Sequence, residues 1–197
     1  VIESVVHTWL TALVRALAKQ FPDIDLDFTV DTARNLREHF RQHRLDLLIQ
    51  NDPVEEAAGN VELVTTGLCR LPIRWVGRPG LLPRRPLRSE DLIDVPLLTF
   101  ARTSSPHAHV RALFIGRERE PRINSFPSVA AILRLANEGF GVAAIPPLFV
   151  RAELDRGSLV QYRGPALPPL DVRRDQVTDI GADCEIAGGI DRRCNRQ

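Results

Sequence analysis

The sequence predicts an α/β fold, because segments with helical periodicity alternate with short apolar segments along most of its 197 residues. Strands that alternate with helices form βαβ units, in which the strands are parallel. Residues 77–86 hold three prolines, two glycines and three arginines, a composition typical of a connecting loop. This loop separates two sets of alternating elements. We therefore expect two α/β lobes rather than one continuous sheet.

The part of the chain before the loop contains two predicted helices and four predicted strands. Residues 4–20 place apolar side chains at three- and four-residue spacing, as an amphipathic helix does, and Pro22 ends this pattern. Residues 25–30 alternate between polar and apolar, as a half-buried strand does. Residues 45–49 are mostly apolar, which suits a buried parallel strand. The other elements are a helix at 33–42 and strands at 61–65 and 71–76.

The part after the loop repeats the alternation. Ser89 is expected to cap a short helix, and Ser104 a longer one with Pro106 in its first turn. Gly139 and Gly157 each follow a helical pattern, so both are expected to end a helix in the left-handed conformation. The longer helices are predicted at 106–115, 128–137 and 147–154, and the strands at 96–100, 122–126, 142–145 and 159–162.

The composition limits the possible partners and compartments. Lys and Arg number 26 and Asp and Glu 25, and this balance argues against a surface that coats nucleic acid. No apolar run approaches the length of a membrane span, and no secretory signal opens the chain. The three cysteines are spread out, which favours a reducing cytoplasm over a disulfide framework. Because methionine is absent, we expect a processed product or a piece of a longer chain.

Catalytic patterns are poor. The sequence has neither a Gly-x-Ser-x-Gly elbow nor a phosphate-binding loop of the Gly-Lys-Ser/Thr type. His39 and His43 have metal-ligand spacing for a helix, but no third ligand is in view, so a polar helix face is the simpler interpretation. We expect no catalytic residue, no metal and no cofactor.

Hydroxyl groups are frequent at the predicted strand-to-helix turns. Ligands of open α/β sheets bind at the carboxyl ends of the strands, and helix N-termini favour anions. Each hydroxyl alone is more simply a helix cap, whereas several together favour a small carboxylate or another polar ligand. Arg102 would add a bidentate contact to an anion, or it is a solvated surface arginine. The hydroxylated turn residues are Ser4, Thr32, Thr103, Ser104, Ser105 and Ser125, and Asp31 precedes Thr32 in the same turn.

Four passages in order resemble the effector-binding domain of LysR-type transcriptional regulators. The first is a long helix, Phe-Pro-Asp and a strand that ends in Asp-Thr, over residues 10–32. The second is Arg-Leu-Asp-Leu-Leu-Ile at 44–49, and the third Ser-Glu-Asp-Leu-Ile-Asp-Val-Pro-Leu-Leu at 89–98. The fourth, at 129–146, ends in Asn-Glu-Gly-Phe-Gly-Val-Ala-Ala-Ile-Pro. The resemblance covers residues 1 to about 169.

The resemblance implies the fold of type 2 periplasmic binding proteins, in which two Rossmann-like lobes are joined by crossover strands with a ligand cleft between them. Residues 1–74 would form the first part of lobe I and residues 75–163 lobe II. Residues 164–172 would be the strand that returns to lobe I. Residues 173–197 lack sustained periodicity, so we expect a divergent or disordered tail.

The resemblance also implies the ligand contacts. Asn51 falls at a family cleft position too, although a turn role is equally good, and Trp75 either lines the hinge side or belongs to the core. The residues that match the family's cleft positions are Ser4, Thr32, Arg102, Thr103, Ser104, Ser125 and Phe126.

The implied function is that of the sensor of a cytoplasmic transcription regulator, a homodimer or tetramer without membrane contact. A small, anionic effector would bind in the cleft and control DNA binding by an N-terminal winged helix-turn-helix outside this sequence. The alternative is a free solute-binding protein of the same fold, matured by removal of a signal and usually monomeric. An enzyme on the same scaffold is a third possibility, but no nucleophile–base pair supports it.

Overall fold

The computed structural model describes residues 1–51 and 62–178, and the chain divides into two compact units. Unit 1 holds the chain up to Arg70 and again from Asp171, and unit 2 is the continuous stretch Leu71–Leu170. Each unit has its own sheet and its own helices, so the predicted α/β class is confirmed. The boundaries predicted from the sequence, at 74–75 and 163–164, lie a few residues inside those of unit 2.

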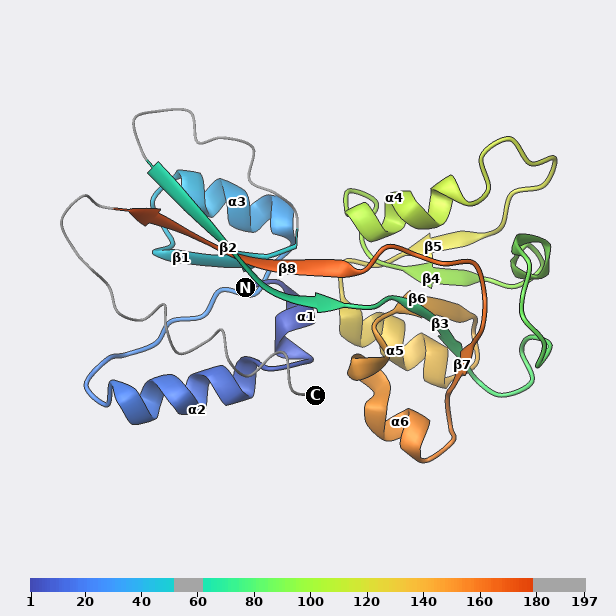
Figure 1. The fold of residues 1–197 in the computed structure, drawn as a ribbon, viewed down its shortest axis with the longest axis horizontal. Helices are drawn as coiled ribbons and strands as arrows, with labels where there is room; N and C mark the ends of the chain where they lie inside the picture. Colours follow the sequence, from blue (N-terminus) through green and yellow to red (C-terminus); the bar gives the residue numbers. More distant parts are fainter. Residues whose placement is uncertain (52–61, 179–197) are drawn as a thin grey trace. The chain divides into compact units, whose positions relative to one another are not determined.

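The sheet of unit 1 has the strand order β1-β8-β2 (Figure 1). Strand β1 is Leu47–Gln50, β2 is Glu62–Leu71 and β8 is Leu170–Thr178. Strands β1 and β8 are antiparallel, with Leu47 opposite Gln176 and Gln50 opposite Arg173. The prediction of parallel strands is therefore wrong for this pair, because the chain comes back from unit 2 in the direction opposite to β1.

Strand β8 continues beyond residue 172, at which the return strand predicted from the sequence ends. Arg174 and Asp175 are both buried in it, with 4% and 1% of their surface exposed. The Asp175 carboxylate accepts hydrogen bonds from Thr65 Oγ1 at 2.6 Å and from Gln50 Nε2 at 3.0 Å. The sequence pattern does not predict this part of the strand, because Arg174 and Asp175 are charged. A charged side chain can be buried only where it has hydrogen-bond partners, and here those partners lie on neighbouring strands. The rest of the predicted tail, residues 179–197, lies outside the described residues.

The predicted helix at 4–20 is two helices. Helix α1 is Glu3–Val6 and helix α2 is Leu10–Gln20. Between them the Thr8 hydroxyl donates to the carbonyl oxygens of Ser4, at 2.9 Å, and Val5, at 3.2 Å. Such bonds from a side chain to the preceding turn compete with the helical pattern, which the periodicity of apolar residues cannot reveal.

The predicted strand at 25–30 is wrong. This segment has no regular secondary structure, and its Thr29 carbonyl accepts a hydrogen bond from the Val1 amino group at 2.7 Å. Ile24, Leu26 and Val30 are between 39% and 52% exposed. A strand requires a ladder of hydrogen bonds to a neighbour, and alternation of apolar residues does not supply one.

The sheet of unit 2 has the order β5-β4-β6-β3-β7 (Figure 1). Strand β4 is parallel to both β5 and β6, whereas β3 is antiparallel to both β6 and β7. The strands are β3 (Arg74–Gly77), β4 (Leu97–Thr99), β5 (Ile123–Ser125), β6 (Val142–Ile145) and β7 (Val160–Tyr162). Every residue of β4 and β6 is buried, so these strands form the centre of the core.

Helix α4 (Ser105–Ala112) lies on one face of this sheet, and helices α5 (Val129–Asn137) and α6 (Arg151–Asp155) lie on the other (Figure 1). The short 3-10 helices are η1 (Ser89–Leu92) and η2 (Pro147–Val150). Gly139 and Gly157 have φ of 78° and 73°, which confirms their left-handed conformation. The cap of η1 is Arg88 rather than Ser89, because the Arg88 backbone N–H donates to the Asp91 carboxylate at 2.7 Å.

For helix α3 of unit 1 (Ala33–Arg41), the expectation that His39 and His43 lie on the same helix is wrong. His39 is helical, but the helix ends at Arg41 and His43 follows it with a φ of 55°. The pair therefore does not share a helix face. Within residues 1–51 and 62–178, no helix is both long enough and apolar enough to cross a membrane.

Candidate functional site

The carboxyl edge of the unit 2 sheet collects five of the seven predicted ligand residues. Strands β4 and β5 are parallel, so both end at this edge, and Thr99 lies opposite Ser125 in the ladder. The Phe126 backbone N–H donates to the Thr99 carbonyl at 2.9 Å, which ties the turn after β5 to the end of β4. Arg102, Thr103 and Ser104 follow β4 within a few residues.

The turn after β4 is ordered by Ser104. Its hydroxyl donates to the Ala101 carbonyl at 2.7 Å and accepts the His107 backbone N–H at 3.4 Å, so it caps helix α4 as predicted. Arg102 and Thr103 in the same turn are exposed. Among the described residues Arg102 forms no ion pair. An exposed, unneutralised guanidinium beside a helix N-terminus is an arrangement that attracts an anion.

Two polar side chains beneath this turn are buried without a hydrogen-bond partner in the described part of the chain. Thr99 is fully buried and its Oγ1 is unpaired, and His107 is 6% exposed with Nδ1 unpaired. Burial lowers the pKa of His107, and the charges of Arg111 and Arg102 lower it further. The imidazole is therefore held neutral at pH 7. Neither residue was predicted as a site residue, although a threonine in the otherwise apolar run 96–100 is a detectable sign of Thr99.

The other two predicted ligand residues lie in unit 1, around the first residues of the chain. Asp31 N–H donates to the Val1 carbonyl at 3.4 Å, and Thr32 follows Asp31 as the cap of helix α3. Ser4 is buried within α1 and is not a cap, since the cap position belongs to Ile2. Ile2 N–H in turn donates to Ile49 in β1, two residues before Asn51.

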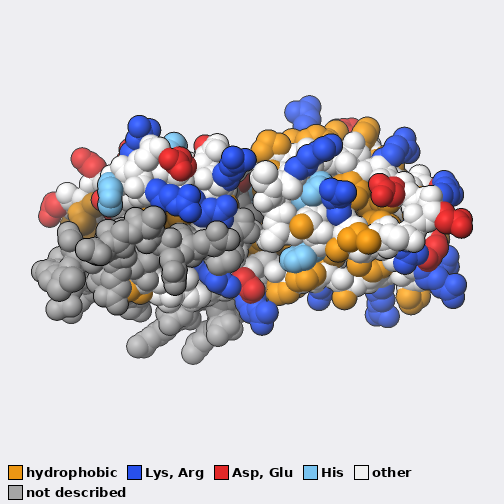
Figure 2. Space-filling model, turned by 90° about the horizontal axis from the view of Figure 1, so that it is seen from above, with side chains coloured by type: hydrophobic (Ala, Val, Ile, Leu, Met, Phe, Trp, Pro, Cys, Tyr) orange, Lys and Arg blue, Asp and Glu red, His pale blue; other side chains and the backbone are white. Residues whose placement is uncertain are grey.

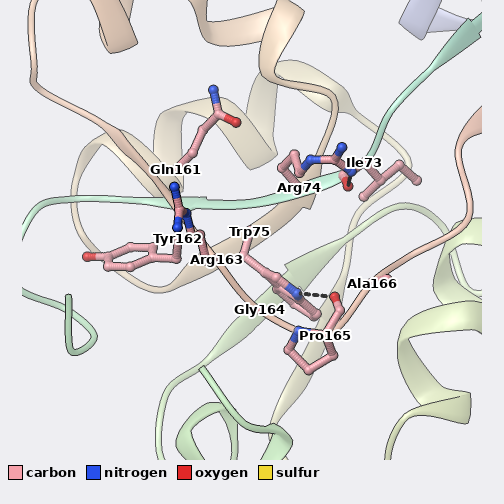
Figure 3. A pocket seen from close by; sticks show the side chains of 9 residues that line it. All are labelled: Ile73, Arg74, Trp75, Gln161, Tyr162, Arg163, Gly164, Pro165 and Ala166. Atoms are coloured by element: carbon pink, nitrogen blue, oxygen red, sulfur yellow. Dashed lines mark hydrogen bonds between the residues drawn. The ribbon is translucent and has the colours of Figure 1, made fainter. Parts of the chain in front are cut away.

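Trp75, for which the sequence left a hinge or a core position open, is part of the core of unit 2. Its side chain is 1% exposed, and its Nε1 donates to the Pro165 carbonyl at 2.9 Å. It also lines a pocket of about 500 Å³ formed where the chain enters unit 2 and leaves it again (Figure 3).

The described residues hold no group of three or more His, Cys, Asp or Glu side chains that would bind a metal ion. On the face shown in Figure 2, positively charged side chains are distributed over the surface of unit 2, with hydrophobic and acidic side chains between them. This face therefore lacks the continuous basic stripe that a nucleic-acid surface requires.

Comparison with known proteins identifies a family for most of the chain. A family model described as the LysR substrate binding domain matches residues 1–173. No match was found among curated proteins.

Several solved structures share the fold. The regulatory domain of CcmR from Synechocystis PCC6803, solved in complex with 2-PG, has a TM-score of 0.74 at 17% identity, covering 90% of this chain and 85% of that one. The OxyR2 regulatory domain from Vibrio vulnificus gives 0.70 at 23% identity, with coverage of 92% and 85%. Full-length LysG from Corynebacterium glutamicum, with its effector Arg bound, gives 0.68 at 13%, with coverage of 91% and 61%. At these identities the structures show the fold alone.

Proposed function

Because the chain belongs to the LysR substrate-binding domain family, we propose that it senses a small anionic effector through the turns at the carboxyl edge of the unit 2 sheet. The fold is the periplasmic-binding-protein-like fold of that family. The chain is thus an effector-sensing domain of a LysR-type transcriptional regulator, and the family match favours this function over a free solute-binding protein.

The observation that carries the anionic effector is the composition of the turn after β4. Arg102 is exposed and without an ion pair among the described residues, and Thr103 and Ser104 place hydroxyl groups beside it at the start of α4. Ser125 and Phe126 lie against the end of the same strand. A guanidinium and hydroxyl groups suit a carboxylate, and the Phe126 ring suits an apolar body.

Ser4 and Thr32 in unit 1 remain proposed effector contacts. Related structures bind small molecules as well, 2-PG for CcmR and Arg for LysG. In the complete regulator, effector binding would control DNA binding by a winged helix-turn-helix, in a cytoplasmic homodimer or tetramer. The chain itself would carry out no catalysis.

The test is a thermal-shift screen of the chain with small carboxylates, including aromatic and short-chain ones, and with neutral and cationic compounds of similar size. Carboxylates should raise the melting temperature, because a ligand that binds only the native state stabilises it. Arg102→Gln should remove most of this shift. Arg122→Gln is the matched control, since Arg122 is exposed and precedes β5 at the other end of that strand.

Stabilisation by neutral or cationic compounds alone would contradict the anionic effector. An equal loss of the shift in both arginine variants would contradict the location. Sedimentation adds a separate check, because a regulator should be a dimer or tetramer whereas a solute receptor is usually a monomer.

A further inference from the structure

The turn that carries Arg102 is joined to the first turn of helix α4 by the Ser104 hydroxyl. This hydroxyl donates to the Ala101 carbonyl at 2.7 Å and accepts the His107 backbone N–H at 3.4 Å. Arg102, which is exposed, lies in the short segment that these bonds close, and His107, which is 6% exposed, ends that segment. A surface guanidinium and a buried imidazole therefore belong to one hydrogen-bonded turn.

Three features of this turn oppose a positive charge on His107. Burial is the first: Nδ1 has no hydrogen-bond partner in the described part of the chain, so the imidazolium form would leave a buried N–H without an acceptor. The second is the pair of charges on Arg111 and Arg102, which, after burial, also lower the pKa of His107. The third is the helix itself, whose first turn is the positive end of its dipole.

No acidic side chain of the surrounding elements offsets these charges. Helix α4 packs on β4, and neither β4 nor its neighbour β5 contains a titratable residue. Residues 101–112, which comprise the turn and α4, contain no Asp or Glu, and their remaining titratable group is the half-buried His109. The turn, the helix and the two strands therefore supply positive charge only.

We propose that effector binding at this turn is linked to the protonation of His107, so that the chain binds an anionic effector more tightly as the pH falls below about 7. The inference rests on the proposed effector site at Arg102. A carboxylate that pairs with Arg102 cancels part of the positive charge that keeps the imidazole neutral, and the imidazole then takes up a proton. Because linkage is reciprocal, the protonated imidazole strengthens the binding of the anion by the same factor.

A single linked proton determines the direction and the pH range of the effect. The pKa of His107 is lowered in the free chain and rises when an anion binds, so the affinity increases as the pH falls through the interval between these two values. Above that interval the imidazole is neutral in both states and the affinity is constant. Uptake of one proton limits the increase to about tenfold per pH unit.

The first experiment measures the pKa of His107 by NMR titration of the imidazole protons in the complete chain. His107→Gln identifies its resonance among those of the five histidines. Arg102→Gln removes one of the repelling charges and should raise this pKa. Arg122→Gln is the matched control, because Arg122 is exposed and precedes β5 at the other end of that strand, and it should leave the pKa unchanged. Saturating benzoate should raise the pKa in the unsubstituted chain and not in Arg102→Gln.

The second experiment is calorimetric titration of the chain with benzoate, and separately with butyrate, at about pH 7.5 and about pH 5.5, where both carboxylates remain ionised. The affinity should be about threefold to tenfold higher at the lower pH. Titration in two buffers of different ionisation enthalpy should show proton uptake on binding. His107→Gln should bind with equal affinity at both pH values, whereas His109→Gln, on the same helix, should keep the increase.

Thermal melts at both pH values verify that each variant is folded, and if His107→Gln does not fold, the His107 pKa in Arg102→Gln decides. An unchanged His107 pKa in Arg102→Gln overturns the linkage, and so does a pH-dependent affinity that survives His107→Gln. Equal affinity of the unsubstituted chain at both pH values also overturns it, while leaving the effector site intact. If neither carboxylate binds at either pH, the effector site at Arg102 fails and the linkage fails with it.

Discussion

His107 is a buried ionisable side chain in the first turn of helix α4, which follows the proposed effector turn. Its backbone N–H is held by Ser104, and its Nδ1 has no partner among the described residues. Its pKa is lowered by burial first, and then by Arg111 and Arg102. Protonation would place a third positive charge in the environment of these two arginines. A change in the protonation state of His107 would therefore change the electrostatic environment of the turn that carries Arg102.

His107 should make the chain less stable in mild acid. The unfolded chain titrates this histidine near pH 6.5, whereas the folded chain does so at a lower pH. Between the two values the unfolded state binds more protons, so the free energy of unfolding decreases as the pH falls from about 6.5 toward the folded-state pKa. Urea unfolding at a series of pH values from about 7.5 to about 5 measures this decrease.

His107→Gln should show a weaker pH dependence than the unsubstituted chain. His109→Gln, a substitution of the half-buried histidine on the same helix, should keep it. An identical pH dependence in the unsubstituted chain and His107→Gln would show that burial of His107 does not contribute.

Among the elements, the central strands of unit 2 were predictable and the elements of unit 1 were less so. The runs at 96–100 and 142–145 are apolar because β4 and β6 are completely buried, and burial is what the sequence pattern reports. The segment at 25–30 has a strand pattern without a strand, since the pattern cannot reveal whether a neighbour is present. Strand β8 lacks a strand pattern, although it is a strand. Its buried Asp175 accepts hydrogen bonds from Thr65 and Gln50, which lie in remote parts of the chain.

The candidate site residues were likewise predictable where local sequence determines their position, and not where packing does. Ser104 and Thr32 cap the helices that the sequence placed after them, so local chemistry was sufficient to find those turns. The orphaned His107 ring nitrogen, by contrast, is a product of packing.

Gly141 controls the contact between β6 and the residue before β4. A Cβ on Gly141 would overlap the carbonyl oxygen of Pro96, and the Val142 N–H donates to that same carbonyl at 2.9 Å. Gly141→Ala should therefore displace β6 from β4 and lower the free energy of unfolding by about 1–3 kcal/mol or more. Urea unfolding followed by the buried Trp75 measures the loss.

Gly67→Ala is the control for that substitution, because a Cβ at Gly67 meets no atom within 4 Å. Its effect should be small. A Gly141→Ala chain as stable as the unsubstituted one would mean that β6 can shift away from Pro96 without cost.

For the whole molecule, the important contrast is that unit 2 is continuous in sequence and unit 1 is not. The fragment 71–170 contains all five strands of its sheet and its own core, so it should fold cooperatively alone. Trp75 is its single tryptophan, and its fluorescence during urea unfolding should follow one sharp transition. The fragment 1–70 lacks β8, the middle strand of β1-β8-β2, and should show no such transition through Trp9.

Cooperative unfolding of 1–70 would mean that β1 and β2 do not need β8. A broad, non-cooperative transition in 71–170 would mean that unit 2 depends on unit 1 for its stability. The complete chain carrying Trp9→Phe provides the reference for Trp75.

The middle position of β8 also bears on synthesis. A ribosome releases residues 1–70 first, yet their sheet is incomplete until Leu170–Thr178 has been translated, after all of unit 2. Domains fold as units as they emerge, so the portion made in the middle should acquire its structure before the portion made first. A frameshift or stop codon just before codon 170 of this sequence would consequently damage unit 1, although most of unit 1 is translated before unit 2, and would spare unit 2.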